Sequence, residues 1–106
     1  MIAKPVVLRE KARSDVADAL DHIVSRDGKN EAGRFLGSLE LACRGVARHP
    51  TAGSERFASQ VGLAGLQHWE IPGSGYLIFY REYPEHIDVW RVLRADSIPR
   101  WLDLGA

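Results

Sequence analysis

The side chains most able to do chemistry lie in the last third of the chain, within segments predicted to be β-strands. His68, Arg81 and Arg91 fall in apolar and aromatic runs at 66–71, 76–83 and 87–93, a composition typical of strands. An imidazole can serve as a general base, and guanidinium groups can stabilise negative charge that develops on a phosphate. We expect Arg81 and Arg91 to face each other across a hairpin. A packed or surface histidine and cross-strand ion pairs are the structural alternatives.

The sequence does not indicate a metal site. Its one cysteine, Cys43, and its four scattered histidines lack the spacing of metal ligands. We expect Cys43 to be a packed core thiol, because free cysteines are among the most buried residues. His86 falls in the break between the last two predicted strands, where a solvated side chain is expected. The sequence therefore predicts neither a metal ion nor an organic cofactor.

Length and composition predict one globular domain, residues 1–106. The chain contains 14 Lys and Arg and 14 Asp and Glu residues, so its formal net charge is zero. Proteins that grip nucleic acid through its phosphates usually carry a basic excess, so direct nucleic-acid binding is not expected. No apolar run approaches the ~20 residues of a membrane helix, and residues 1–8 lack the features of a signal peptide. We expect a cytoplasmic protein that does not associate with membranes.

The predicted elements follow the order β-α-α-β-β-β. Apolar residues recur at helical spacing over 10–27 and 30–48, and Asn30 is placed to cap the second helix. The predicted strands are 5–8, 66–71, 76–83 and 87–93. Residues 51–65 form a long loop, and a short helical turn capped by Asp96 or Ser97 follows the last strand. This order predicts an α+β fold, with a helical hairpin on one face of a mainly antiparallel sheet.

The strand predicted at 76–83 carries large apolar groups on both of its faces. Its first five residues are all apolar or aromatic, and strands of this kind are usually covered on both sides. The helical hairpin can cover only one side. We therefore expect the other face of the sheet to form an apolar patch that binds an obligate protein partner.

The order and spacing of these segments resemble the ParE/RelE superfamily of toxins from type II toxin–antitoxin systems, and most closely its ParE branch. The resemblance covers nearly the whole chain. It rests on Ala12 and Asp15-Val16 in the first helix, Ala32 and Phe35 in the second, His49-Pro50-Thr51-Ala52-Gly53 at its end, Gly65-Leu66, Ile78-Phe79-Tyr80-Arg81, residues 87–93, and Ile98-Pro99 with Leu102. Two features depart from the family pattern. Arg94 stands where the family often has His, in a segment that is one residue short, and the chain is neutral where many relatives are basic.

The resemblance implies a toxin that poisons its own cell unless a cognate, ParD-like antitoxin binds it. ParE members act on DNA gyrase and block replication, whereas RelE members enter the ribosomal A site and cut mRNA. A shared fold does not decide between these functions. We favour the gyrase inhibitor, which needs a binding surface and no catalytic machinery, so the chain is not expected to be an enzyme. A decayed toxin that only binds its antitoxin is a further alternative.

The ribonuclease alternative is weakened by the residues that RelE-like enzymes use, which are Lys and Arg on the sheet and a Tyr near the C-terminus. This chain has lysines only at positions 4, 11 and 29, and its C-terminal aromatic residue is Trp101. An indole cannot usefully exchange a proton. If the chain is a ribonuclease, its catalytic candidates are His68, Arg81 and Arg91.

Two sets of binding residues follow from the resemblance. Trp and Arg most often dominate binding energy, so the expected target-binding residues are Arg94, Arg100 and Trp101, the alternative being that Trp101 folds back to finish the core. Partner antitoxins are partly disordered alone and fold along the toxin's helical hairpin and sheet. The expected antitoxin contacts are Trp69, Ile78, Tyr80 and Trp90, for which burial in the core is the alternative.

Overall fold

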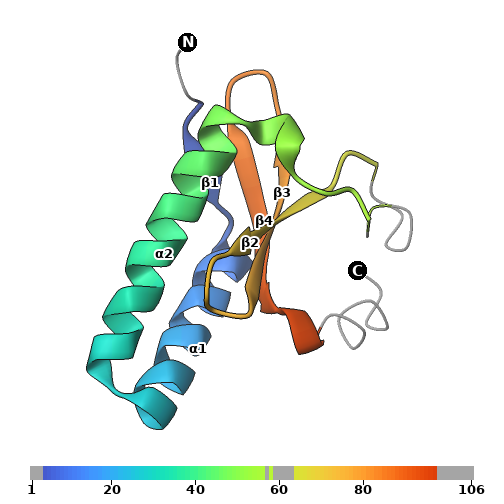
Figure 1. Ribbon diagram of the computed structural model, residues 1–106. Helices are drawn as coiled ribbons and strands as arrows, with labels where there is room; N and C mark the ends of the chain where they lie inside the picture. Colours follow the sequence, from blue (N-terminus) through green and yellow to red (C-terminus); the bar gives the residue numbers. More distant parts are fainter. Residues whose placement is uncertain (1–3, 57, 59–63, 98–106) are drawn as a thin grey trace.

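Two antiparallel helices cover one face of a four-stranded sheet (Figure 1). The computed structural model describes residues 4–56, 58 and 64–97. The elements are β1 (Val6–Leu8), α1 (Glu10–Asp27), α2 (Lys29–Arg48), β2 (Gln67–Ile71), β3 (Tyr76–Glu82) and β4 (Ile87–Arg94), with 3₁₀ turns at Pro50–Ala52 and Ala95–Ser97. The predicted α+β fold with its helical hairpin is confirmed.

The sheet has the strand order β1-β4-β3-β2, and it is mixed rather than wholly antiparallel. β2, β3 and β4 form an antiparallel meander, whereas β1 pairs in parallel with β4, from Val6 opposite Ile87 to Leu8 opposite Val89. β4 is therefore a central strand along its first residues. Beyond Val89, β1 offers it no further partner. This loss of strand pairing beyond Val89 determines which groups contact the two arginines of β4, Arg91 and Arg94.

The helical hairpin turns at a single residue, Gly28. Its φ of 93° lies in a region that residues with a Cβ rarely adopt, so the chain reverses without a longer loop. The Gly28 N–H donates to the carbonyl of Val24 at 3.1 Å. The prediction that Asn30 caps the second helix is wrong, because α2 already begins at Lys29 and no side chain caps it.

The main core lies between the helices and the sheet. It contains Phe35 and Val46 of α2 and the inward-facing residues of β3 and β4, including Ile78 and Val89. The Phe35 and Tyr76 rings meet edge to face with centroids 5.1 Å apart. Cys43 packs against this core, and burial raises the pKa of its thiol, as predicted for a packed thiol.

The second face of the sheet carries a smaller core, which corrects the prediction of a bare apolar patch. Leu77 and Phe79 pack with Leu66, and Phe79 and Leu66 are almost fully buried. Ala58 and Trp90 lie against this cluster. The loop between α2 and β2 thus supplies cover that the sequence pattern did not reveal.

A β-bulge interrupts the pairing of β3 with β4. Phe79 lies opposite Arg91, but Tyr80 lies opposite Val89, so Trp90 is the extra residue. Arg81 lies opposite Asp88. The prediction that Arg81 and Arg91 face each other is therefore wrong: the turn that joins Tyr83 N–H to the His86 carbonyl at 2.8 Å sets a register that separates the two arginines.

Candidate functional site

Arg91 and Val92 of β4 meet Asp15 of α1 in a polar contact between the two elements, which is called the seam below. The Arg91 Nε and Nη2 donate to the two carboxylate oxygens of Asp15 at 2.7 and 2.9 Å, and the backbone N–H of Val92 donates to Asp15 Oδ2 at 3.0 Å. The hydrogen bond from Asp15 raises the pKa of Arg91. Asp15 thus takes the place of β1 just beyond the end of that strand. Arg91, predicted as a catalytic candidate, is engaged in an ion pair that holds the fold together.

The other two catalytic candidates have separate surroundings. His68 of β2 packs on the Phe79 ring with centroids 5.9 Å apart, and burial, with a smaller contribution from Arg56, lowers its pKa. The Arg81 guanidinium lies 5.8 Å from the centroid of Tyr83. The register places His68 and Arg91 on either side of Phe79, but Arg91 is bonded to Asp15 and Arg81 lies over Tyr83.

The hairpin turn holds the last of the histidines considered for chemistry. The His86 ring stacks on the Tyr83 ring at 5.1 Å with an interplanar angle of 10°. Among the described residues, no group of three His, Cys, Asp or Glu side chains could hold a metal ion.

Arg94, the first predicted target-binding residue, lies at the end of β4. Its Nη2 donates to Asp96 Oδ2 at 2.7 Å, and its Nη1 lies 3.4 Å from Nε2 of His22 on α1. These residues border a cleft between the end of α1 and the β2–β3 turn, which Arg26 and Tyr76 also line. Asp96 was predicted as a helix cap, and here it pairs with Arg94. Arg100 and Trp101, the other two predicted target-binding residues, lie outside the described residues.

The predicted antitoxin contacts lie on both faces of the sheet. Ile78 and Tyr80 belong to the main core beneath the helices and expose no surface, so their placement on an open face is corrected: the pleat directs them toward the hairpin. Trp69 lies half-buried at the junction of α2 and β2. A Cβ on Gly45 would lie only 2.7 Å from its ring. Trp90 lies half-buried beside the smaller core.

Tyr80 also joins the core to the turn that ends α2. Its hydroxyl donates to the carbonyl of Pro50 at 2.8 Å, and burial raises the pKa of this phenol to about 12. Gly53 packs so closely against the hydroxyl that a Cβ there would overlap it. The His49-to-Gly53 segment noted in the sequence therefore has a structural role, because it accommodates Tyr80.

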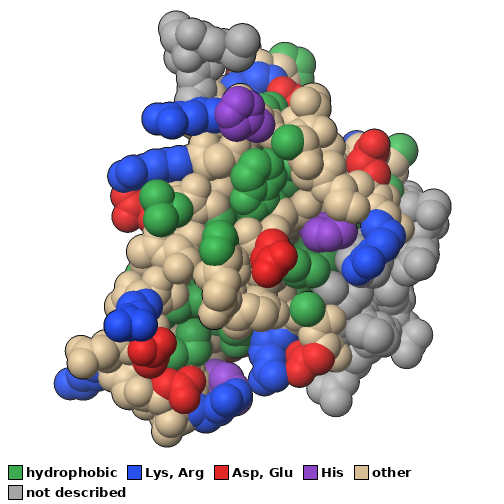
Figure 2. Space-filling model, viewed as in Figure 1, with side chains coloured by type: hydrophobic (Ala, Val, Ile, Leu, Met, Phe, Trp, Pro, Cys, Tyr) green, Lys and Arg blue, Asp and Glu red, His purple; other side chains and the backbone are tan. Residues whose placement is uncertain are grey.

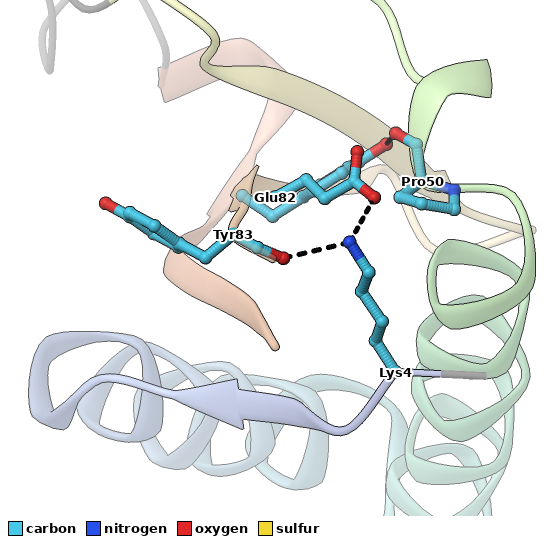
Figure 3. A network of polar contacts seen from close by, with 5 residues as sticks. Lys4, Pro50, Glu82 and Tyr83 are labelled. Atoms are coloured by element: carbon cyan, nitrogen blue, oxygen red, sulfur yellow. Dashed lines mark hydrogen bonds and ion pairs between the residues drawn. The ribbon is translucent and has the colours of Figure 1, made fainter. Parts of the chain in front are cut away.

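A second polar tie fixes the start of the chain to the end of β3 (Figure 3). Lys4 Nζ donates to Glu82 Oε2 at 2.6 Å and to the carbonyl of Tyr83 at 2.9 Å. At the other end of β1, Arg9 donates to the buried Asp88 at 2.7 Å. These pairs cannot be predicted from sequence patterns, since each joins residues about 80 positions apart.

The surface around Trp69 is hollowed. Ser54, His68, Glu70 and Leu77 line the depression together with Trp69. Figure 2 shows hydrophobic side chains in the middle of this face, flanked by acidic and histidine side chains. None of the described helices is both long and apolar enough to cross a membrane.

Comparison with known proteins now decides the family. Residues 6–99 match the family model of the ParE toxin of the type II toxin–antitoxin system parDE. The chain belongs to the ParE toxin family. A solved structure described as the chromosomal ParDE toxin–antitoxin system from P. aeruginosa matches with a TM-score of 0.72 and 16% sequence identity, over 87% of this chain and 96% of that one. That match supports the ParE fold. A search of curated protein sequences gives no match.

The sequence indicates several of the site residues but not the residues with which they form hydrogen bonds. Asp15 was noted as a ParE-family position, but its bond to Arg91 was not predicted. No sequence pattern singles out His22, which lies beside Arg94. Asp15 lies beyond the first turn of α1, and its partners are on β4, a pairing that cannot be read from sequence.

Proposed function

We propose that this ParE-family chain is the toxin of a type II toxin–antitoxin pair, that it inhibits DNA gyrase, and that a cognate antitoxin blocks it. The observation that carries the proposal is the difference in surroundings between two arginines, Arg91 and Arg94. Arg91 is engaged by Asp15, whereas Arg94 remains 41% exposed at the edge of a cleft. An inhibitor needs such a binding residue and no catalytic arrangement.

The antitoxin is proposed to bind along the junction of α2 and β2. Trp69 lies there, half-buried, in a surface depression bordered by His68 and Glu70. An amphipathic segment that folds on binding would place an apolar side chain against Trp69 and its polar side chains against the rim. Burying the rest of an indole supplies a large apolar contact.

The first test is supercoiling of relaxed plasmid by purified gyrase, with the full chain made by cell-free synthesis. We expect inhibition by the native chain, and a loss of about tenfold or more in potency for Arg94→Ala, as for a hot-spot arginine. Arg48→Ala is the matched control, since Arg48 is also an exposed arginine, at the end of α2. Equal potency of both variants would remove Arg94 from the target surface.

A test in cells separates the alternatives. The chain is induced without antitoxin while incorporation of labelled thymidine and labelled methionine is followed over the first minutes. Early loss of thymidine incorporation alone supports gyrase as the target. Early loss of methionine incorporation would instead support mRNA cleavage, and His68 and Arg81 would be the residues to replace. Unchanged growth would indicate a chain that only binds its antitoxin.

Antitoxin binding is tested by co-expression and capture of the complex. We expect Trp69→Ala to weaken capture by about tenfold or more, as for a buried aromatic anchor. Trp90→Ala is the comparison variant, since Trp90 is also half-buried but packs beside the smaller core. Circular dichroism checks that both variants fold. Unchanged capture of a folded Trp69→Ala chain would refute the proposed location.

A further inference from the structure

The cleft beside Arg94 gathers polar side chains from three parts of the fold. It lies between the last turns of α1, the β2–β3 turn and the end of β4, and its volume is about 320 Å³, within the range of ligand sites. Arg26 of α1, Gly75 of the turn and Arg94 of β4 each contribute to its walls. Figure 2 shows basic, acidic and histidine side chains together at the lower edge of the view, where α1 ends in Figure 1.

The side chain of Tyr76 reaches this cleft from the core. Tyr76 is only 8% exposed, and its ring packs on Phe35, yet it lines the cleft. Burial raises the pKa of its hydroxyl, and the charges of Arg94, Asp96 and Arg26 also act on it. None of the described residues forms a hydrogen bond with this hydroxyl. Since buried polar groups normally have a hydrogen-bond partner, the Tyr76 O–H is placed to donate to a ligand in the cleft.

Arg26 brings a positive charge to the same cleft. Its side chain is exposed in the last turn of α1, and it forms no ion pair or hydrogen bond within the part of the chain that the structure describes. A cation in the last turn favours the helix by itself, but this position also places the guanidinium on the wall of the cleft. A guanidinium has only donors, so the ligand that complements Arg26 and the Tyr76 hydroxyl is an anion.

The charges around the cleft favour one kind of anion. Arg94 already takes a carboxylate there, since its Nη2 donates to Asp96 Oδ2 at 2.7 Å, and Asp27 also lines the cleft. Two carboxylates repel a doubly charged phosphate more strongly than a singly charged group. The chain as a whole has no net positive charge with which to attract nucleic acid. A carboxylate from a protein therefore fits this cleft better than a phosphate.

We propose that the cleft receives an acidic side chain of the protein that the toxin targets, and that Arg26 and the Tyr76 hydroxyl bind its carboxylate beside Arg94. The inference rests on the proposed function, in which Arg94 is the target-binding residue, and it adds that the target presents an acidic segment. A carboxylate has two oxygens, so it can accept from a guanidinium and from a phenol at once. Asp96 is then a competitor within the chain for Arg94.

The first measurement is an NMR titration of the isotopically labelled full chain with a hexaglutamate peptide. The Arg26 Nε–H and the Gly75 backbone N–H report on two sides of the cleft. We expect both signals to shift with one dissociation constant, and a hexaglutamine peptide to leave them unchanged. No shift at about 10 mM hexaglutamate, well above a millimolar dissociation constant, would overturn the proposal.

Two substitutions test the two donors. Tyr76→Phe removes only the hydroxyl and keeps the ring that packs on Phe35, and it should weaken peptide binding about tenfold, as for a hydrogen bond to a charged group. Arg26→Gln should weaken binding by about tenfold as well. Arg13→Gln is the matched control, since Arg13 is also exposed on α1 but does not line the cleft. Circular dichroism checks the fold of each variant.

Two results with these variants would contradict the proposal. Native affinity in a folded Tyr76→Phe chain would mean that the hydroxyl does not meet the carboxylate. Equal losses in Arg26→Gln and Arg13→Gln would mean that the peptide responds to overall charge and not to the cleft. Inorganic phosphate that shifts the same signals at a lower concentration than hexaglutamate would also refute a carboxylate site, and would indicate a nucleic-acid backbone as the ligand.

Gyrase supercoiling separates this inference from the proposed function. Tyr76→Phe should lose inhibitory potency in proportion to its loss of peptide affinity. Inhibition at native potency by Tyr76→Phe would keep gyrase as the target and overturn the carboxylate site. Peptide binding through Arg26 and Tyr76 without any inhibition by the native chain would support the carboxylate site and remove gyrase as the target.

Discussion

Arg91 and Arg94 lie three residues apart on β4 but in different surroundings. The seam around Arg91 has two hydrogen bonds to Asp15, whose side chain is only 10% exposed. At the end of the strand, Arg94 pairs with Asp96, whose side chain is 66% exposed. At Arg91 the helix α1 contributes a carboxylate, that of Asp15, whereas at Arg94 it contributes the imidazole of His22 and the carboxylate comes from Asp96. The same residue type therefore pairs with a largely buried carboxylate at one position and with an exposed carboxylate at the other.

The largest effect is expected from removing the carboxylate of the seam. Asp15→Ala leaves Arg91 and the Val92 N–H without their common acceptor, which should lower the free energy of unfolding by about 3 kcal/mol. Urea denaturation followed by circular dichroism measures the change. Asp15→Asn keeps one acceptor and should lose less. A loss below about 1 kcal/mol in Asp15→Ala would mean that Asp15 and Arg91 form no more than a surface pair.

High pH probes another buried polar group beneath the helices. The pKa of Tyr80 is about 12 in the folded chain and about 10 when unfolded. Between those values the unfolded chain releases a proton that the folded chain keeps, so stability falls as pH rises from about 10 to 12, by up to about 3 kcal/mol. Thermal unfolding at several pH values measures this loss. Tyr80→Phe should remove most of it, and an unchanged pH slope in that variant would show that other groups cause it.

An arginine-to-lysine exchange compares the two positions directly. Lysine cannot reproduce the two-point contact that Arg91 makes with Asp15, so Arg91→Lys should cost about 1–2 kcal/mol of stability. Arg94→Lys should cost less than about 0.5 kcal/mol, since an exposed pair contributes little. Both values come from the same urea titrations. Equal losses would contradict the distinction between a largely buried and an exposed ion pair.

The smallest effect is expected at Asp96. Asp96→Ala removes an exposed ion pair with Arg94 and should change the free energy of unfolding by no more than about 0.5 kcal/mol. The same change removes the carboxylate neighbour of Arg94, so the gyrase inhibition proposed above should be retained or strengthened. A stability loss above 1 kcal/mol would show that the end of β4 is as firmly held as the seam.

The fold could be predicted from sequence where periodic patterns extend over many residues. The first helix was predicted at 10–27, as observed, and the hairpin of β3 and β4 differs by one residue at its ends. The parallel pairing of β1 was not predicted, because three apolar residues carry no information about their partner strand.

The site was less predictable, because it depends on which face each strand residue takes. Ile78 and Tyr80 were expected at a partner surface and lie in the core. Apolar residues at every position from 76 to 80 give no alternation from which to assign a face. The bulge at Trp90 then shifts the pairing of β4 against β3, and no residue in the sequence signals it.

The parallel pairing of β1 with β4 has a consequence for how the chain folds. Val6 pairs with Ile87, so the sheet encloses almost the entire sequence between its first and last strands. The two helices meet each other through residues near in sequence, so their hairpin can form early, but β1 has no partner strand until β4 has been synthesised. Long-range pairing of this kind slows folding. A nascent chain therefore acquires the complete ParE fold only late, when nearly all of it has left the ribosome.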